Sequence, residues 1–565
     1  MKAVCEKFSF VEVRRIGIAL FFFIFFCVGL FVFDDYGISM DESVNRENAR
    51  LIMSNIFDKD PSILSNPNRK YHGAAFELIL YGLEKALGLS AAPRTYYLMR
   101  HLMTFFMFYL GVIFFYKLCL DRFRHWQFSL LGPLFLILSP RIFADSFYNS
   151  KDLVFLSLFI IAVYTLINFL DRKTARSAVV HSLVCGLLVD VRAVGIIIPV
   201  LSLFFYLVEI INPHKEERAD HIPKRDRFRK RNVLLLFVFL TAIFIFVFWP
   251  TLWTHPVQHM MEAFRYMVKF PVTTRVLYLG EFVSADSLPW HYVPVWILIT
   301  TPLVYIFFFI IGFLSLGRQL IKSFRPFLFN RRNDFIYLLW IVLPVAAAII
   351  FRSTLYNGYR HLFFVYPALL MVALIGLNIF CQMLKSHFRY GICDSLLKIT
   401  AMIIFLNCAS VLSFMIRNHP YQNVYFNRLA GPDMPTIQRR FEMDYWGLSF
   451  RKGLEYLLNH NNDEKISIVV PDDRYLVNTV FLSRDQQKRL FLCAPGALPK
   501  RYLITNYRDD TSLLVRNGVY KIDVDGAKIL GVHESLVGSS QTESQNSGRC
   551  VDLISYINNK NWLRL

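Results

Sequence analysis

Long apolar runs, separated by short polar segments, recur along the first three quarters of the chain. A run of about 20 apolar residues is long enough to cross a bilayer. The pattern predicts a polytopic α-helical membrane protein with about eleven spans. The weakest point is the pair of runs 178–190 and 194–211, where Asp190 and Arg192 interrupt one long apolar stretch. If that stretch is a single span, the orientation of everything after it inverts. The other predicted runs are 16–33, 102–120, 126–140, 153–170, 233–250, 293–316, 335–351, 362–383 and 397–416.

Basic residues concentrate in alternate connections between these runs. The connection 213–232 holds eight Lys and Arg residues, and 317–334 holds five. The longer connection 251–292 holds only three. Cytoplasmic loops of membrane proteins are enriched in Lys and Arg, so this alternation favours eleven spans with the N-terminus in the cytoplasm. The polar tail after 416 then lies outside the cytoplasm.

The composition excludes several classes of protein. Hydrophobic residues make up 55% of the 565 residues and charged residues only 18%. This excludes a disordered chain, a secreted disulfide scaffold and an ordinary cytosolic enzyme. The net charge of +20 is explained by the basic connections, so no nucleic-acid partner is expected. No C-x-x-C pair is present, and Cys493 and Cys550 can pair only if the tail is extracytoplasmic.

The tail has a different pattern from the rest of the chain. Short apolar segments at 465–471 and 501–506 read as buried strands, and 519–524 alternates like an exposed strand. The segment 446–460 reads as a helix with leucines on one side. We therefore expect a transmembrane domain at 1–416, followed by a small extracytoplasmic α/β domain at 417–565.

The first outer loop, 34–96, is long for a connector, and such loops are often functional. Ser39 and Glu42 have the spacing of a helix capping box, with Asp41 in the first turn, where the helix dipole stabilises an anion. Capping alone therefore explains part of this motif without catalysis. Farther on, apolar positions recur at helical spacing in 71–89, which predicts a helix along the membrane surface.

Asp41-Glu42, placed just after the first span, resembles the motif of the membrane-integral C-type (GT-C) glycosyltransferases. The likeness is to the family 39-like group, which includes the protein O-mannosyltransferases and the lipid A aminoarabinose transferases. It covers most of 10–450. Further segments that agree in order are SPR at 139–141, YNSKD at 148–152, LPWHY at 288–292, YRH at 359–361, HPY at 419–421 and DYWG at 444–447.

The resemblance implies a donor sugar on a polyprenyl phosphate, embedded in the lipid bilayer. The leaving phosphate needs nearby positive charge, and the acceptor nucleophile needs a carboxylate as general base. Asp41 is the best candidate for that base. Glu42 has three alternatives: it orients Asp41, binds a sugar hydroxyl, or only caps the helix.

Three basic residues at the outer face are candidates for binding the donor phosphate: Arg192, Arg360 and Lys151. An ionisable residue at membrane depth is a functional candidate by default. The alternative for Arg192 is an ion pair with Asp190 that holds the break in the apolar stretch. For Lys151 and Arg360 the alternative is anchoring at the membrane interface.

The remaining candidates would contact the sugar or the acceptor. Interfacial aromatic residues often form only a belt, so this assignment competes with an anchoring role. The families that the chain resembles work without a metal, so no cofactor is expected, although a divalent metal stays open. The sugar- and acceptor-binding candidates are His72, Asp152, Tyr278, Trp290, Tyr292 and His361.

The sequence therefore predicts a glycosyltransferase that moves a sugar from a polyprenyl-phosphate donor to a glycolipid, wall polymer or protein on the outer face of the membrane. The alternative is a transporter or flippase of a lipid-linked or anionic substrate. A transporter should show related breaks in both halves, whereas only 190–195 is broken here. No Asn-x-Ser/Thr sequon is present, which favours a bacterial inner membrane.

Overall fold

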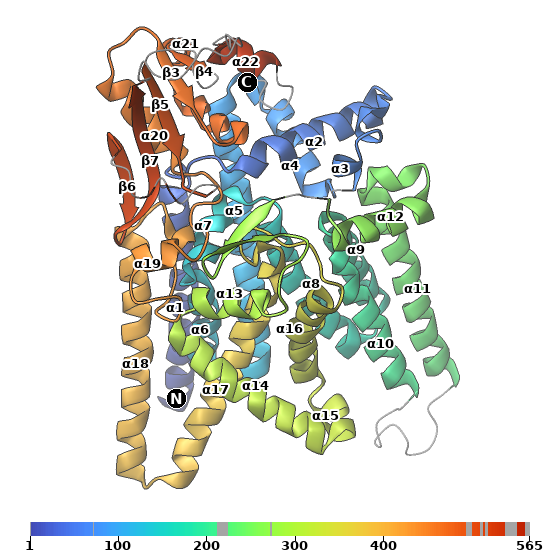
Figure 1. Cartoon of the computed structure of the whole chain (residues 1–565). Coiled ribbons are helices and arrows are strands. Elements are labelled where there is room, and N and C mark those ends of the chain that lie inside the picture. Colours follow the sequence, from blue (N-terminus) through green and yellow to red (C-terminus); the bar gives the residue numbers. More distant parts are fainter. Residues whose placement is uncertain are drawn as a thin grey trace.

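The computed structural model describes residues 2–71, 73–211, 224–271, 274–492, 500–508, 512, 514, 518–536 and 551–559. Long helices run side by side as a bundle, and a domain that contains a sheet lies at one end of it (Figure 1). The bundle helices are α1 (Lys2–Val32), α5 (Pro93–Phe123), α6 (Trp126–Ile137), α7 (Pro140–Tyr148), α8 (Asp152–Arg172), α9 (Ala175–Val191), α10 (Ile197–Ile211), α11 (Lys224–Phe248), α14 (Leu303–Lys322), α16 (Arg332–Ile350), α17 (Tyr366–His387) and α18 (Tyr390–Arg417).

Nine helices in the described residues are long and apolar enough to cross a membrane, or ten if the bent pair α6–α7 is one span. The two members of that pair meet at 67°. The predicted run 178–190 forms α9, which has only 17 residues. The polytopic helical fold is thus confirmed, and the difference from eleven spans lies at the bent pair and at this short helix.

The uncertain stretch 178–211 forms two helices that fold back on each other. α9 ends at Arg192, where the backbone is extended, with φ −150° and ψ 128°. His181 of α9 contacts Ser202 of α10, with 2.8 Å between Nε2 and Oγ. Lys173, just before α9, pairs with Glu209 near the end of α10 at 2.7 Å. The stretch is therefore not one continuous helix, and a second crossing of the membrane by α9 stays a prediction.

The two ends of the bundle carry different connections. One end, here called the basic end, carries the basic connection 317–334. There Arg122 pairs with Asp334 at 2.6 Å, and Arg332 pairs with Glu209 at 2.6 Å. The domain end holds the connections that the charge pattern placed outside the cytoplasm (Figure 1). Its smaller elements are α2 (Met40–Phe57), α3 (Pro67–Lys70), α4 (Ala75–Ala86), α12 (Pro256–Val268), β1 (Arg275–Tyr278), β2 (Glu281–Ser284), α13 (Tyr292–Thr300) and the short helix η6 (Arg360–Val365).

The C-terminal domain is built on a six-stranded sheet with the order β6-β7-β5-β3-β4-β8. β3 (Ile466–Val469) pairs in parallel with β4 (Leu490–Leu492) and β5 (Lys500–Thr505). The antiparallel strands are β6 (Tyr520–Val524), β7 (Ala527–Leu536) and β8 (Val551–Asp552).

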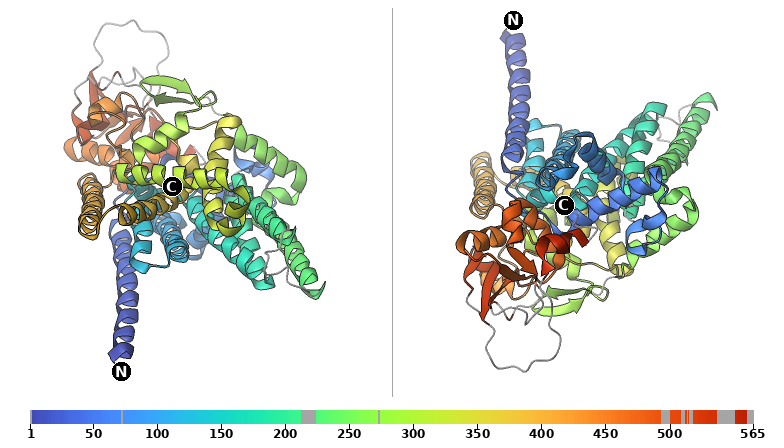
Figure 2. Two further views of the ribbon diagram at one scale, coloured as in Figure 1. Left: turned by 90° about the horizontal axis from the view of Figure 1, so that it is seen from below. Right: turned by 90° about the horizontal axis from the view of Figure 1, so that it is seen from above.

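The predicted tail helix is present as α20 (Phe450–His460), with Leu454, Leu457 and Leu458 buried. Short helices complete the domain. Viewed from the domain end, the sheet lies over one side of the bundle, and α11 and α12 lie on the other side (Figure 2). The short helices are α19 (Met434–Gln438), η8 (Asp473–Phe481), α21 (Arg484–Lys488) and α22 (Leu553–Asn559).

Candidate active site

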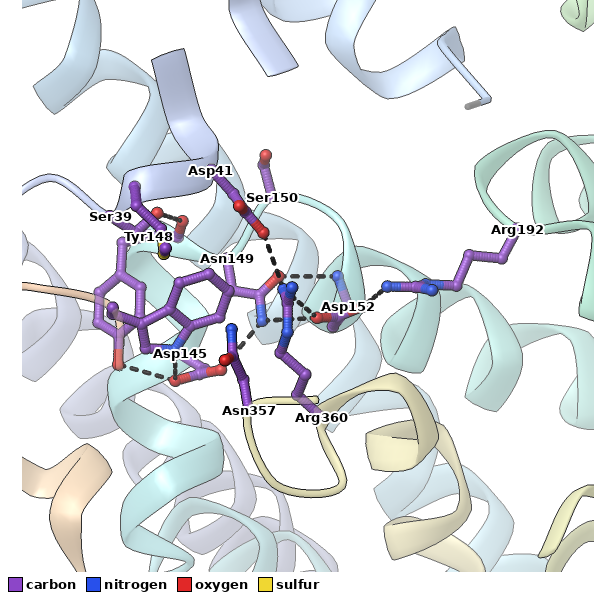
Figure 3. A network of polar contacts seen from close by, with 12 residues as sticks. Ser39, Asp41, Asp145, Tyr148, Asn149, Ser150, Asp152, Arg192, Asn357 and Arg360 are labelled. Atoms are coloured by element: carbon purple, nitrogen blue, oxygen red, sulfur yellow. Dashed lines mark hydrogen bonds and ion pairs between the residues drawn. The ribbon is translucent and has the colours of Figure 1, made fainter. Parts of the chain in front are cut away.

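Charged side chains from four separate parts of the chain meet at the domain end of the bundle (Figure 3). Arg360 Nη1 donates to Asp41 Oδ2 at 2.9 Å and lies 3.3 Å from Asp152 Oδ2. Arg192 donates to the other carboxylate oxygen of Asp152. The structure thus brings together four of the predicted site residues, two carboxylates and two guanidinium groups, in one continuous cluster.

Local helix geometry fixes Asp41. The residue lies in the first turn of α2, where free backbone N–H groups favour an anion. Glu42 Oε2 accepts from the Ser39 backbone N–H at 2.8 Å, as the capping spacing predicts. Glu42 also lies 3.1 Å from His101 Nε2 and is 1% exposed. Its carboxylate is therefore used for capping and for holding α2 against α5, whereas Asp41 faces Arg360.

The turn between α7 and α8 orients Asp152. The Asn149 amide donates to Asp152 Oδ2 at 3.1 Å and to Asp145 Oδ2 at 2.9 Å. Asp145 Oδ1 accepts from Tyr148 at 2.7 Å and from Trp446 Nε1 at 3.2 Å. Because Asp145 and Asp152 are both almost fully buried, these hydrogen bonds compensate for the loss of water. The resemblance indicated this turn as a motif, but it did not single out Asp145 or Asn149.

The ion pair between Asp190 and Arg192, which was the alternative to phosphate binding by Arg192, is not formed in the structure. The Asp190 carboxylate accepts from the backbone N–H groups of Ala74 at 3.3 Å and of Ala75 at 2.8 Å, at the beginning of α4. A Cβ atom on Gly73 would lie 1.3 Å from the Asp190 carbonyl oxygen, so only glycine allows this approach. Arg192 instead turns toward Asp152. The two arginines of the cluster keep one donor each, because Nε of Arg192 and Nε of Arg360 are buried without a hydrogen-bond partner in the described part of the chain.

The charges of the cluster set its protonation. Partial burial raises the pKa of the Asp41 carboxyl, but the positive charges of Arg360 and Arg474 outweigh that effect and hold the pKa below its ordinary value. The Asp41 side chain is 31% exposed, so it remains accessible. Burial, with Arg192 nearby, lowers the pKa of the Lys151 amine to about 7. Because the Asp41 carboxylate is negatively charged and accessible, it can accept a proton. The cations beside it can bind an anion at the same time.

The C-terminal domain holds the segment that precedes Asp41. The Asn478 side chain accepts from the Ile38 N–H at 2.9 Å and donates to the Ile38 carbonyl at 3.0 Å. Met40 N–H donates to the Trp446 carbonyl at 3.2 Å. Gly37 packs so closely that a Cβ atom there would lie 2.3 Å from the carbonyl oxygen of Leu448.

The same domain reaches the segment that precedes Arg360. Arg508 Nη2 donates to Asn357 Oδ1 at 2.7 Å, and Arg508 Nε donates to Glu442 at 3.2 Å. The Arg360 guanidinium stacks on the Trp446 ring, 4.6 Å from its centre. Trp446 belongs to the DYWG segment that the resemblance indicated, but sequence reasoning missed Glu442, Asn478 and Arg508, because nothing in the sequence of the tail shows which residues it covers.

Other predicted residues lie apart from the cluster. Tyr278 OH lies 2.6 Å from His291 Nδ1, and the Tyr278 ring packs against Tyr292. Both tyrosines are buried, whereas Trp290 is 69% exposed. His361 follows Arg360 directly and contacts the Tyr356 ring. His72 lies outside the described residues. The sugar-binding roles of these positions stay predictions.

Among the side chains that the structure describes, no group of three or more His, Cys, Asp or Glu could hold a metal ion. The cluster around Asp152 alternates positive and negative groups, so its carboxylates already have cationic partners. That the protein acts without a metal ion stays a prediction from the resemblance.

Comparisons with known proteins find similarity among solved structures. No family model matches the chain, and no curated protein matches it. Among solved structures, the chain is similar to the crystal structure of ArnT from Cupriavidus metallidurans bound to undecaprenyl phosphate. The match covers 91% of this chain and 98% of that one, with 10% identity and a TM-score of 0.45. At this level of similarity, conclusions about function depend on the residues of the site.

Proposed function

We propose that the protein is a membrane glycosyltransferase that moves a sugar from a polyprenyl-phosphate carrier to an acceptor. The observation that supports this is the cluster itself: one accessible carboxylate, Asp41, pairs with the buried Arg360, and the partly buried Arg192 joins them through Asp152. The Nε donors of both arginines have no partner among the described residues. The cluster lies at the end of helices long enough to cross a bilayer. A lipid-linked phosphate would reach such a position with its chain still in the membrane.

In this proposal Asp41 is the general base. The acceptor O–H or N–H gives its proton to Asp41 while its heavy atom forms a bond to the anomeric carbon of the sugar. The bond from that carbon to the phosphate oxygen breaks, and the polyprenyl phosphate leaves as an anion. Arg360, Arg192 and Lys151 would stabilise the charge that develops on the phosphate. Donors aligned in advance need little rearrangement at the moment of reaction.

The location follows from the charge pattern. The basic connection 317–334 belongs to the end of the bundle opposite the cluster (Figure 1), and basic loops favour the cytoplasm. We therefore infer that transfer takes place on the outer face, in a bacterial inner membrane. The acceptor would be a glycolipid, a wall polymer or a protein, and the sugar a hexose or a pentose.

The test is transfer by the purified protein in detergent, using polyprenyl phosphates that carry hexoses or pentoses. Asp41→Asn should lower turnover by about 10²–10⁴, the usual cost of losing a general base, while binding of polyprenyl phosphate persists. Asp58→Asn is the matched control, because Asp58 is an exposed carboxylate at the other end of α2.

Near-normal transfer by a folded Asp41→Asn protein would remove Asp41 as the base. If the wild-type protein transfers none of these sugars but moves the labelled lipid across reconstituted vesicles, the transporter alternative replaces the enzyme.

A further inference from the structure

An open cavity of about 540 Å³ lies at the basic end of the bundle. This volume is within the range of small-molecule sites. The short helix α15 (Phe324–Asn330) joins α14 to α16 beside the cavity, at the end of the bundle that lies away from the sheet (Figure 1). The lining comes from the last turn of α5, the end of α15 and the beginning of α16, and its charged residues are Arg122, Arg331, Arg332 and Asp334.

The cavity lies where the apolar helices end. α5, α14 and α16 are three of the helices that are long and apolar enough to cross a membrane. Arg122 belongs to the last turn of α5, and Arg331 directly precedes α16. Charged side chains at the ends of membrane-spanning helices lie at the level of the lipid headgroups. The headgroups of the surrounding bilayer therefore have direct access to the cavity.

Positive charge exceeds negative charge around the cavity. The two carboxylate oxygens of Asp334 accept from Arg122 at 2.6 and 3.0 Å. Asp334 is therefore already paired, and the Arg331 guanidinium lies 3.5 Å from it with 49% of its side chain exposed. Lys322 and Arg325, which are exposed in the same connection, have no carboxylate partner among the described residues. An anionic ligand is favoured by this surplus of positive charge.

Arg332 contributes less to that surplus, because it has carboxylate partners outside the lining. It pairs with Asp171 of α8 and, at 2.6 Å, with Glu209 of α10. Glu209 is shared with Lys173 at 2.7 Å. These pairs hold the beginning of α16 against the neighbouring helices and leave Arg331 as the most accessible cation of the lining.

Large apolar side chains are exposed in the same connection. Ile321, near the end of α14, is 87% exposed, and Phe324, at the beginning of α15, is 53% exposed. Exposed apolar groups beside basic ones are typical of a surface that lies in the membrane interface. A free phosphate offers nothing to these apolar side chains. A phospholipid offers acyl chains to them and a phosphate to the arginines.

We propose that this basic cavity binds the headgroup of an anionic phospholipid of the surrounding bilayer. Arg331 contacts the lipid phosphate, Arg122 keeps Asp334 neutralised, and the acyl chains pack along Ile321 and Phe324. The inference goes beyond the proposed function and does not depend on it, because the cavity and the charged cluster lie at opposite ends of the bundle. The lipid bound here would be a permanent partner of the protein and not a substrate.

The experiment titrates the purified full chain, in a neutral detergent, with short-chain phosphatidylglycerol, with phosphatidylcholine of the same chain length, and with inorganic phosphate. Native mass spectrometry measures how much of each is bound. The wild-type protein should bind phosphatidylglycerol more tightly than the other two. Arg331→Gln should weaken this binding about fivefold, the effect of one basic residue at an anionic lipid surface.

A second variant and a control separate the cavity from the general charge of the basic end. Asn330→Asp adds a negative charge to the lining without removing an arginine, so it should also weaken binding of phosphatidylglycerol. Arg389→Gln is the matched control, because it removes one exposed positive charge between α17 and α18, at the same end of the bundle (Figure 1). Its affinity for phosphatidylglycerol should equal that of the wild-type protein.

Three results would overturn the proposal. Equal binding of phosphatidylglycerol and phosphatidylcholine would mean that the cavity does not select an anionic headgroup. Phosphate that binds as tightly as phosphatidylglycerol would make the occupant a free anion and not a lipid. Equal affinities of the Arg331→Gln, Asn330→Asp and Arg389→Gln proteins for phosphatidylglycerol would show that the lipid binds elsewhere.

Discussion

The Nη1 atom of Arg360 donates a hydrogen bond of 2.9 Å to Asp41, which lies 319 positions earlier in the chain. The pair joins the first outer segment to the loop before α17. In the proposed reaction the two groups have different roles: Asp41 accepts a proton from the acceptor, and Arg360 binds the phosphate of the donor. Their contact keeps the base negatively charged before the substrate arrives.

This contact predicts a pH effect. Partial burial raises the pKa of Asp41, but Arg360 and Arg474 hold it below its ordinary value, so the base stays ionised as the pH falls toward that lowered pKa. Arg360→Gln removes the larger of the two charge effects, and the pKa of Asp41 should rise. The acidic limb of the transfer rate should therefore move to higher pH, measured by single-turnover transfer between about pH 4 and 8. A displacement of the limb by one pH unit would correspond to roughly 1.4 kcal/mol. A limb that stays in place, or moves to lower pH, would contradict the role of Arg360 in tuning Asp41.

Arg192 should be needed for use of the donor. Arg192→Ala removes a charge-assisted contact worth about 1.5–3 kcal/mol, so affinity for polyprenyl phosphate should fall about ten- to a hundredfold. Arg192→Lys should recover the charge but not the two-pronged geometry. Arg417→Ala is a suitable control, because this arginine is 64% exposed and outside the cluster. Unchanged donor affinity in a folded Arg192→Ala protein would leave this residue the structural role of holding Asp152.

Glu42 should matter less for transfer than Asp41. Glu42→Gln keeps an oxygen that can accept from the Ser39 N–H, so the cap persists. The contact with His101 weakens, since a charge is lost. We expect near-normal turnover with a loss of about 1 kcal/mol in stability. A loss of turnover as large as that of Asp41→Asn would place Glu42 in the chemistry instead.

Asn478 should affect activity from a distance. Asn478→Ala leaves the Ile38 N–H and C=O without their partners, which should cost about 1–3 kcal/mol and loosen the segment before Asp41. Turnover should fall while affinity for polyprenyl phosphate stays constant. Asn461→Ala is the control, because the Asn461 side chain donates to Tyr502 OH and accepts from the Asp463 N–H, both inside the domain. Equal effects of both variants on turnover would mean that the domain acts through its stability alone.

Reporter fusions at positions 222 and 480 should lie on opposite sides of the membrane. Position 222 falls in the basic connection, and position 480 in the C-terminal domain. Finding both reporters on one side of the membrane would contradict the eleven-span topology.

The long helices could be predicted from the sequence, because apolar runs of this length are typical of helices that cross a membrane. The resemblance indicated Asp41 and the segment that holds Arg360. Arg192 was indicated by its position, because an ionisable residue at membrane depth is a functional candidate by default. The sequence could not predict which of the charged residues form ion pairs with one another. Asp190 and Arg192 are close in sequence, but Asp190 belongs to the last turn of α9 and Arg192 has an extended backbone, so their side chains find different partners. Contacts such as Asn478–Ile38 depend on tertiary packing over 440 positions and leave no local pattern.

The attachment of the 36–40 segment to the C-terminal domain has a consequence for how the protein becomes active. The segment that precedes Asp41 is made well before its partners, Asn478 and Trp446. Until those residues are made, the segment lacks these hydrogen bonds. Competence would therefore arise in one late step, when the final domain folds onto the bundle, so that incomplete chains in the membrane would consume no lipid-linked donor.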